Sequence, residues 1–138
     1  MANWQTQYIG WQADGEALAT SVTLSADGVI GAAVTTGRGR FDINFSSAAL
    51  TDTGVGFDIG LIIVQANTVA STSVWAEIGN LVLGDATGRG DALTTVTNAV
   101  ISVINQDDNQ IRLYGYVQGS TTIMTCSAKI YPASARTI

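Results

Sequence analysis

The stretch that decides the fold is Arg40-Phe41-Asp42-Ile43-Asn44-Phe45-Ser46, in which large apolar residues alternate strictly with polar ones. Successive side chains of a β-strand point to opposite faces, so Phe41, Ile43 and Phe45 share one face. A helix would instead need apolar residues three and four positions apart. The segment therefore predicts a strand with one buried face and one exposed face.

Further strand patterns lie on both sides of this segment, separated by glycine, aspartate, asparagine and serine, which favour turns. The unbroken apolar run Leu61-Ile62-Ile63-Val64, within a strand expected at 57–66, predicts burial on both faces. The other expected strands are residues 18–24, 29–35, 73–78, 81–83, 99–104, 110–118 and 121–131.

The residues between the strands predict how some of them are connected. Ser25-Ala26-Asp27-Gly28 has the chemistry of a tight turn and favours a hairpin between the strands at 18–24 and 29–35. Gly79-Asn80 is expected as a hinge between two short strands, and Gly119-Ser120 as the link between the last two.

No segment keeps a 3.6-residue period over ten or more residues, so we expect little or no helix. A chain of 138 residues is long enough for one domain with its own core. We predict an all-β protein, a single antiparallel β-sandwich of jelly-roll type over residues 17–138, preceded by an N-terminal arm of residues 1–16. The expected core residues are Phe41, Ile43, Phe45, Ile62, Val64, Leu113 and Ile130.

The charge composition argues against several classes of function. The chain has six lysine and arginine residues against eleven acidic ones and a net charge of −5, which disfavours nucleic acid and anionic membranes as partners. It has no histidine and one cysteine, which removes the commonest general base, the commonest metal ligand and any internal disulfide. We therefore expect a protein that is not an enzyme and needs no cofactor or metal.

Several short motifs have weak functional interpretations. Arg89-Gly90-Asp91 spells an integrin-type tripeptide, but a match of this length arises readily by chance in a loop. Asp107-Asp108 is an adjacent acidic pair, whereas glycosidase carboxylates must face each other across a sugar. Asp14, Glu16 and Asp27 offer oxygen ligands for calcium without any known calcium-loop spacing, so solvated loop acids are the simpler interpretation.

The aromatic residues and the cysteine have structural interpretations as well. Trp4, Tyr8 and Trp11 gather in the N-terminal arm, and Trp75 lies in mid-chain. Such side chains stack on sugars or anchor protein interfaces, and we favour docking of the arm on a neighbouring subunit. Cys126 alternates with apolar neighbours, which predicts a buried small hydrophobic residue.

The low charge also predicts an assembly. Charged residues make up 12% of the chain, about half the usual share. Strand edges are normally protected by lysine or proline, and this chain has one of each, Lys129 and Pro132. We therefore expect other chains to cover much of the surface.

Two segments support a resemblance to a known group of proteins. The stretch from Gly37 to Asp52, a Gly-x-Gly turn before Phe41, Ile43 and Phe45 and then small residues, Leu50 and Asp52, resembles trimeric knob domains of bacteriophage fibres and virion spikes. Residues 110–117 and 122–131 resemble the last two strands of jelly rolls of the tumour-necrosis-factor and C1q type. The segment after Asp52 fits the knob pattern only loosely.

The resemblance implies a homotrimer in a phage virion. Knobs of that kind follow a long trimeric stalk, whereas this chain starts at Met1 without heptads or shaft repeats. We therefore expect a capsid decoration or head-spike protein that binds other virion proteins and stabilises the particle through its interfaces. The alternative is a receptor-binding or carbohydrate-binding knob of a tail fibre or spike, with a host-surface glycan as partner.

Overall fold

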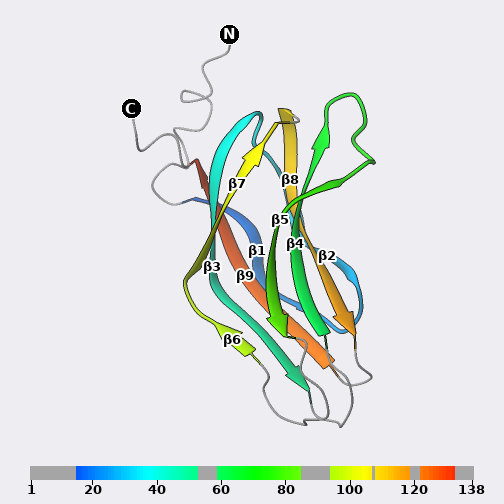
Figure 1. Cartoon of the computed structure of the whole chain (residues 1–138), viewed down its shortest axis with the longest axis vertical. Coiled ribbons are helices and arrows are strands. Elements are labelled where there is room, and N and C mark those ends of the chain that lie inside the picture. Colours follow the sequence, from blue (N-terminus) through cyan, green and yellow to red (C-terminus); the bar gives the residue numbers. More distant parts are fainter. Residues whose placement is uncertain (1–14, 53–58, 85–93, 107, 119–121, 133–138) are drawn as a thin grey trace.

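The computed structural model describes residues 15–52, 59–84, 94–106, 108–118 and 122–132. These residues form nine β-strands and no helix, which confirms the all-β prediction (Figure 1). The strands are β1 (Glu16–Leu24), β2 (Gly28–Thr35), β3 (Gly39–Asp52), β4 (Ile59–Thr68), β5 (Ala76–Gly84), β6 (Thr94–Val96), β7 (Ala99–Asn105), β8 (Asp108–Gln118) and β9 (Thr122–Pro132).

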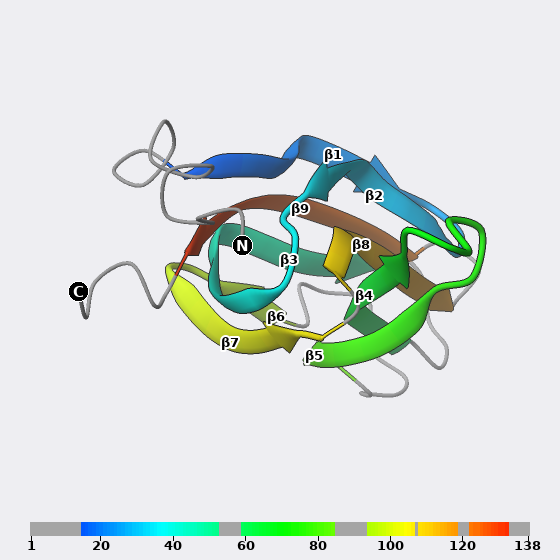
Figure 2. The same cartoon turned by 90° about the horizontal axis from the view of Figure 1, so that it is seen from above.

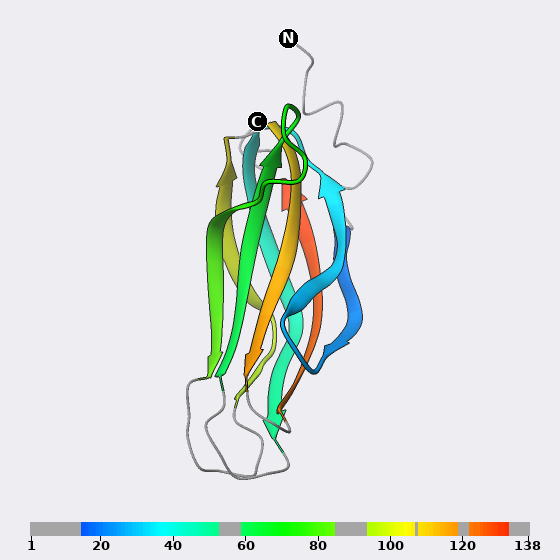
Figure 3. The same cartoon turned by 90° about the vertical axis from the view of Figure 1, so that its right-hand side faces the viewer.

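The strands form two antiparallel sheets that pack face to face (Figures 2 and 3). Sheet A has the order β1-β9-β3-β6, with β7 also paired to β3, and sheet B has the order β2-β8-β4-β5. β7 and β6 pair with successive parts of β3, so they act as one edge strand interrupted at Thr97-Asn98. With this edge strand counted once, each sheet has four strands in a jelly-roll order, and the predicted sandwich is confirmed. β6, with three residues, was too short to be predicted from a periodic pattern.

The predicted hairpin between the first two strands is wrong. β1 lies in sheet A and β2 in sheet B, and β9 and β8 are divided between the sheets in the same way. The turn at Asp27 therefore carries the chain from one sheet to the other, and the Asp27 carboxylate accepts a hydrogen bond of 2.8 Å from the backbone amide of Val117 in β8. Turn chemistry indicates where a chain reverses, but two strands joined by a turn pair only if the next strand stays in the same sheet.

The two short strands predicted at 73–78 and 81–83 are in fact one strand, β5. The expected hinge at Gly79-Asn80 is wrong, because both residues pair with β4. A Cβ atom on Gly79 would lie 2.9 Å from Cγ1 of Val103 in β7. The glycine is therefore explained by close packing between the edges of the two sheets.

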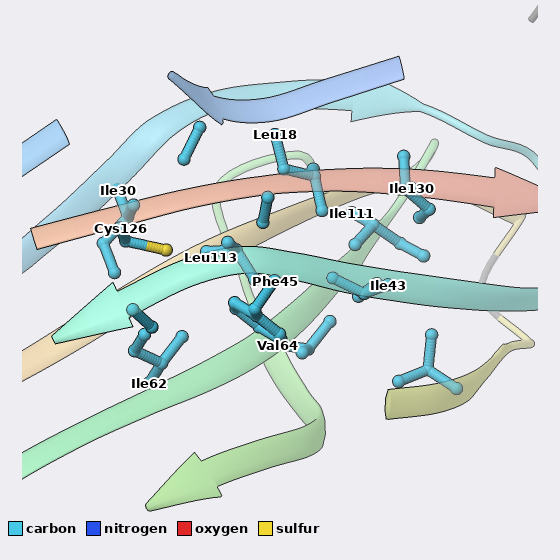
Figure 4. Close-up of a cluster of buried hydrophobic side chains, with 14 of the residues drawn as sticks. Leu18, Ile30, Ile43, Phe45, Ile62, Val64, Ile111, Leu113, Cys126 and Ile130 are labelled. Carbon is cyan, nitrogen blue, oxygen red and sulfur yellow. The ribbon is translucent and has the colours of Figure 1, made fainter. Parts of the chain in front are cut away.

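The core lies between the sheets, where the inward faces of both meet (Figure 4). All seven predicted core residues are fully buried, which confirms the assignment of strand faces from the alternating pattern. Met124, Cys126, Ala128 and Ile130 line the inner face of β9 as predicted. The most buried large side chains are Phe41, Phe45, Leu18, Ile30, Ile43, Leu50, Ile62, Leu83, Ile111, Leu113 and Met124.

β1 is less regular than its sequence pattern predicted. Leu18 and Ala19 are both buried, because the pairing with β9 shifts register on either side of Ala19. Ser21 in the same strand has a φ of 47°, in the left-handed region that few side chains adopt. β1 begins at Glu16, and residues 1–14 of the predicted arm lie outside the described residues.

Candidate functional site

The outer face of sheet B carries a row of aromatic and cationic side chains. In β8, Ile111 and Leu113 point into the core, so Arg112, Tyr114 and Tyr116 point outward and are partly exposed. Trp75, which directly precedes β5, joins them from the loop after β4. We call Trp75, Arg112, Tyr114 and Tyr116 the cation–aromatic row.

Arg112 occupies the centre of this row and is held on several sides. Its guanidinium carbon lies 4.0 Å from the ring centroid of Trp75 and 5.9 Å from that of Tyr114. Its Nε donates a hydrogen bond of 2.8 Å to Oε1 of Gln65 in β4. Burial lowers the pKa of the Arg112 guanidinium, but arginine remains charged at neutral pH. The arrangement therefore presents a fixed positive charge on the sheet.

Tyr114 and Tyr116 continue the row along β8. Their ring centroids are 5.2 Å apart and the rings are inclined by 59°. Across the sheet, Tyr114 pairs with Val29 in β2 and with Ile63 in β4. Ile63 is only 4% exposed although it points away from the cluster between the sheets, so the predicted burial of β4 on both faces holds at Ile63, whereas Leu61 and Gln65 on the same face are half-buried.

A second surface lies where edge strands β5 and β7 run along the same side of the sandwich (Figure 2). Large apolar side chains border it on both sheets: Val82 in β5 is 60% exposed on the outer face of sheet B, and Val100 and Ile104 in β7 are 57% and 50% exposed on the outer face of sheet A. Glu77 is the one charged residue in these two strands. We call this surface the β5/β7 side.

The β5/β7 side also borders a buried polar atom without a partner. Asn44 in β3 pairs with Val100 across the sheet. Among the described residues, its Oδ1 is the one buried side-chain oxygen or nitrogen that has no hydrogen-bond partner. A buried polar atom without a partner costs free energy, so Asn44 lowers the stability of this part of sheet A.

A buried polar cluster at one end of the sandwich has a structural role. Nδ2 of Asn105 donates to Oγ1 of Thr36 at 2.9 Å and to the carbonyl of Gly37 at 3.0 Å. Oδ1 of Asn67 accepts hydrogen bonds of 3.0 Å from Asn109 Nδ2 and from the backbone amide of Gln110. These groups are engaged with one another, so the cluster fixes the ends of β2, β4, β7 and β8.

The structure does not gather the acidic residues considered as calcium ligands. Asp27 is engaged by the amide of Val117, Glu16 begins β1, and Asp14 lies outside the described residues. Within the described ranges, no group of three or more acidic or cysteine side chains is placed to hold a metal ion. Of the pair Asp107-Asp108, Asp107 is outside those ranges and Asp108 begins β8.

Several other candidate residues lie outside the residues that the structure describes. Trp4, Tyr8, Trp11 and the tripeptide Arg89-Gly90-Asp91 lie outside the described residues, so their predicted roles stay predictions. Cys126 is buried as predicted, and burial raises the pKa of its thiol to about 12.

Sequence reasoning missed the cation–aromatic row. The signal was present in Arg112-Leu113-Tyr114-Gly115-Tyr116, where alternation places a cation and two tyrosines on one face of a strand. The contributions of Trp75 and Gln65 follow from the pairing of β4 with β8, which a single sequence does not reveal.

Comparisons with protein-family models, with curated proteins and with solved structures find no match to this chain. In the part of the chain that the structure describes, there is no helix with the length and apolar character needed to cross a membrane.

Proposed function

We propose that this chain is a non-enzymatic structural protein of a bacteriophage virion, a capsid decoration or head-spike protein that assembles as a homotrimer. The observation that supports the homotrimer is the lack of edge protection on the β5/β7 side. Its two edge strands contain neither lysine nor proline, and they expose Val82, Val100 and Ile104. Exposed edges of this kind associate with other chains unless they are protected.

The proposed action is stabilisation through interface area. Burying the exposed valine and isoleucine side chains against a neighbouring copy contributes about 25 cal/mol for each Å² of apolar surface removed from water. A closed ring of three copies leaves no free end on which further copies could add. The virion location rests on the resemblance of residues 37–52 to phage knobs.

Sedimentation equilibrium tests the assembly. The wild type should sediment at three times the mass of one chain at micromolar concentration. The double substitution Val100→Lys and Ile104→Lys places two charges in the interface and should weaken association by at least about a hundredfold, since each 1.4 kcal/mol corresponds to a factor of ten. Val69→Lys is the matched control, because Val69 is 69% exposed in the loop after β4.

A monomeric wild type, or an unchanged mass in the double variant, would contradict this assembly. The virion location is tested separately by labelling purified phage particles with an antibody against the chain and imaging them by electron microscopy. Label on the capsid supports the proposal, and particles without label contradict it.

A second function is favoured by the cation–aromatic row. Aromatic rings beside amide side chains, here Gln65 and Asn80, are typical of sites that bind carbohydrate. The row therefore supports a receptor-binding or glycan-binding knob as the alternative function.

A further inference from the structure

We infer that the cation–aromatic row binds a saccharide that bears a carboxylate, with the carboxylate on the terminal nitrogens of Arg112 and the sugar ring against Tyr114 and Tyr116. This inference rests on the second function above and does not depend on the trimer.

Arg112 keeps hydrogen-bond donors that can bind a ligand. A guanidinium group has five N–H donors, and the Nε donor is used by Gln65. No described residue accepts a hydrogen bond from the terminal nitrogens or forms an ion pair with Arg112. Two parallel N–H groups therefore remain for the planar, bidentate contact that a carboxylate makes.

The guanidinium group of Arg112 is already positioned. The Trp75 ring at 4.0 Å and the hydrogen bond to Gln65 fix the plane of the guanidinium before any ligand arrives. A side chain that is held in its binding geometry loses less conformational entropy when it binds. This favours Arg112 as an anchor over a mobile surface cation.

The charge of the whole chain does not oppose such a ligand strongly. The net charge is −5, but at physiological ionic strength a charge is screened beyond about 8 Å. Glu77 lies two strands from Arg112, because Gln65 stands between them in the register, at a spacing of about 10 Å. Its carboxylate accepts a hydrogen bond from Asn80 and, among the described residues, forms no ion pair with Arg112.

The surroundings of Arg112 favour a sugar ring as the rest of the ligand. The strand that carries the row, β8, is paired on both sides, with β2 and with β4. A peptide therefore finds no free backbone edge there to extend the sheet. Recognition must come from side chains alone, and the partly exposed rings of Tyr114 and Tyr116 offer apolar faces beside hydroxyl groups. The apolar face of a sugar ring packs on such rings while its hydroxyl groups stay hydrogen-bonded.

Nuclear magnetic resonance titration of the full-length ¹⁵N-labelled chain tests the inference with a matched pair of sugars. D-galacturonate and D-galactose differ in a carboxylate at one carbon. Galacturonate should shift the Nε–H signal of Arg112, the indole signal of Trp75 and the amide signals of β8, with a dissociation constant on the order of 1 mM. Galactose should bind at least about tenfold more weakly, because it lacks the charged hydrogen bonds.

Substitutions test the contribution of Arg112 separately from that of the tyrosine rings. Arg112→Gln should weaken galacturonate binding at least about tenfold. Arg112→Lys should weaken it less, because lysine keeps the charge but lacks the two parallel N–H donors. Arg40→Gln, the same charge change on the outer face of sheet A, should change binding less than about twofold. Tyr116→Leu removes one ring without touching the pair of Arg112 and Trp75, and should weaken binding several-fold.

Three results would overturn the inference. Equal binding of the two sugars would show that the carboxylate is not recognised, and no shift with either sugar at about 20 mM would show that the row is not a sugar site. If galacturonate shifts the signals of the cation–aromatic row only in the monomeric Val100→Lys, Ile104→Lys variant, another copy covers this face in the wild type. The trimer is judged by sedimentation, so failure of either proposal is recognised separately.

Discussion

Replacing Gly31 with alanine should destabilise the fold strongly, although Gly31 is an exposed residue in β2. Its φ is 71°, in the left-handed region that favours glycine. A Cβ atom at this position would lie 1.9 Å from the carbonyl oxygen of Leu18 in β1. The residue marks the place where backbone from sheet B passes directly against backbone from sheet A.

The expected size of the effect combines two costs. Placing an alanine in the left-handed region costs about 1–2 kcal/mol. The clash is with a backbone atom, which has no rotamer by which to move away, so β1 and β2 must separate at a cost of about 1–3 kcal/mol. The free energy of unfolding should therefore fall by roughly 2–5 kcal/mol, a large part of the roughly 5–15 kcal/mol typical of a domain.

Gly28→Ala in the same strand is the matched control. Its φ is outside the left-handed region, and the nearest atom to its Cβ would be Cδ2 of Leu24 at an ordinary 3.7 Å. Urea unfolding followed by circular dichroism should show a lower midpoint for Gly31→Ala with the same slope, and little change for Gly28→Ala. If Gly31→Ala unfolds within about 0.5 kcal/mol of the wild type, the close approach of β1 and β2 is wrong.

Two further predictions concern buried polar groups. Asn105→Ala should lower the free energy of unfolding by about 1–3 kcal/mol, because Thr36 and Gly37 lose their donor. Asn105→Asp should lower it more, because a carboxylate would face three oxygen atoms. Equal stability of the wild type and Asn105→Ala in urea would contradict the role of the cluster. The raised pKa of Cys126 means that, between about pH 9 and 12, the unfolded chain loses a proton that the folded chain keeps. The free energy of unfolding should therefore fall as the pH rises through that window, by up to about 1.4 kcal/mol per pH unit, in the wild type but not in Cys126→Ala. Parallel pH profiles of the two proteins in urea unfolding would refute this prediction.

The strands and their buried faces were predictable because the signal is local. Phe41, Ile43 and Phe45 are separated by single polar residues, and only a strand places all three on one face. The same holds for Leu113 in β8 and Ile130 in β9, which are fully buried as expected.

The division of strands between the sheets was not predictable, because it depends on contacts distant in sequence. The residues around Asp27 specify a reversal of the chain, but β1 pairs with β9, more than a hundred residues away. The sequence around Gly79 indicates a hinge, whereas the reason for this glycine is Val103, a close neighbour in the other sheet that is distant in sequence. The cation–aromatic row was missed for the same reason, since Trp75, Gln65 and Arg112 come together through the register of β4 with β8.

The positions of the two proposed surfaces make them compatible in one assembly. β8, which carries Arg112, Tyr114 and Tyr116, belongs to sheet B, so a trimer joined through Val100 and Ile104 on the outer face of sheet A leaves these three side chains outside the contact. Three weak sites held in one particle bind a repeated ligand about 10²- to 10⁴-fold more tightly than one site does, provided that the ligand spans them. We therefore expect a surface coated with polygalacturonate to retain the wild type far longer than the Val100→Lys, Ile104→Lys monomer in surface plasmon resonance, while both bind single galacturonate equally. Equal retention of the two would mean that the sites act one at a time.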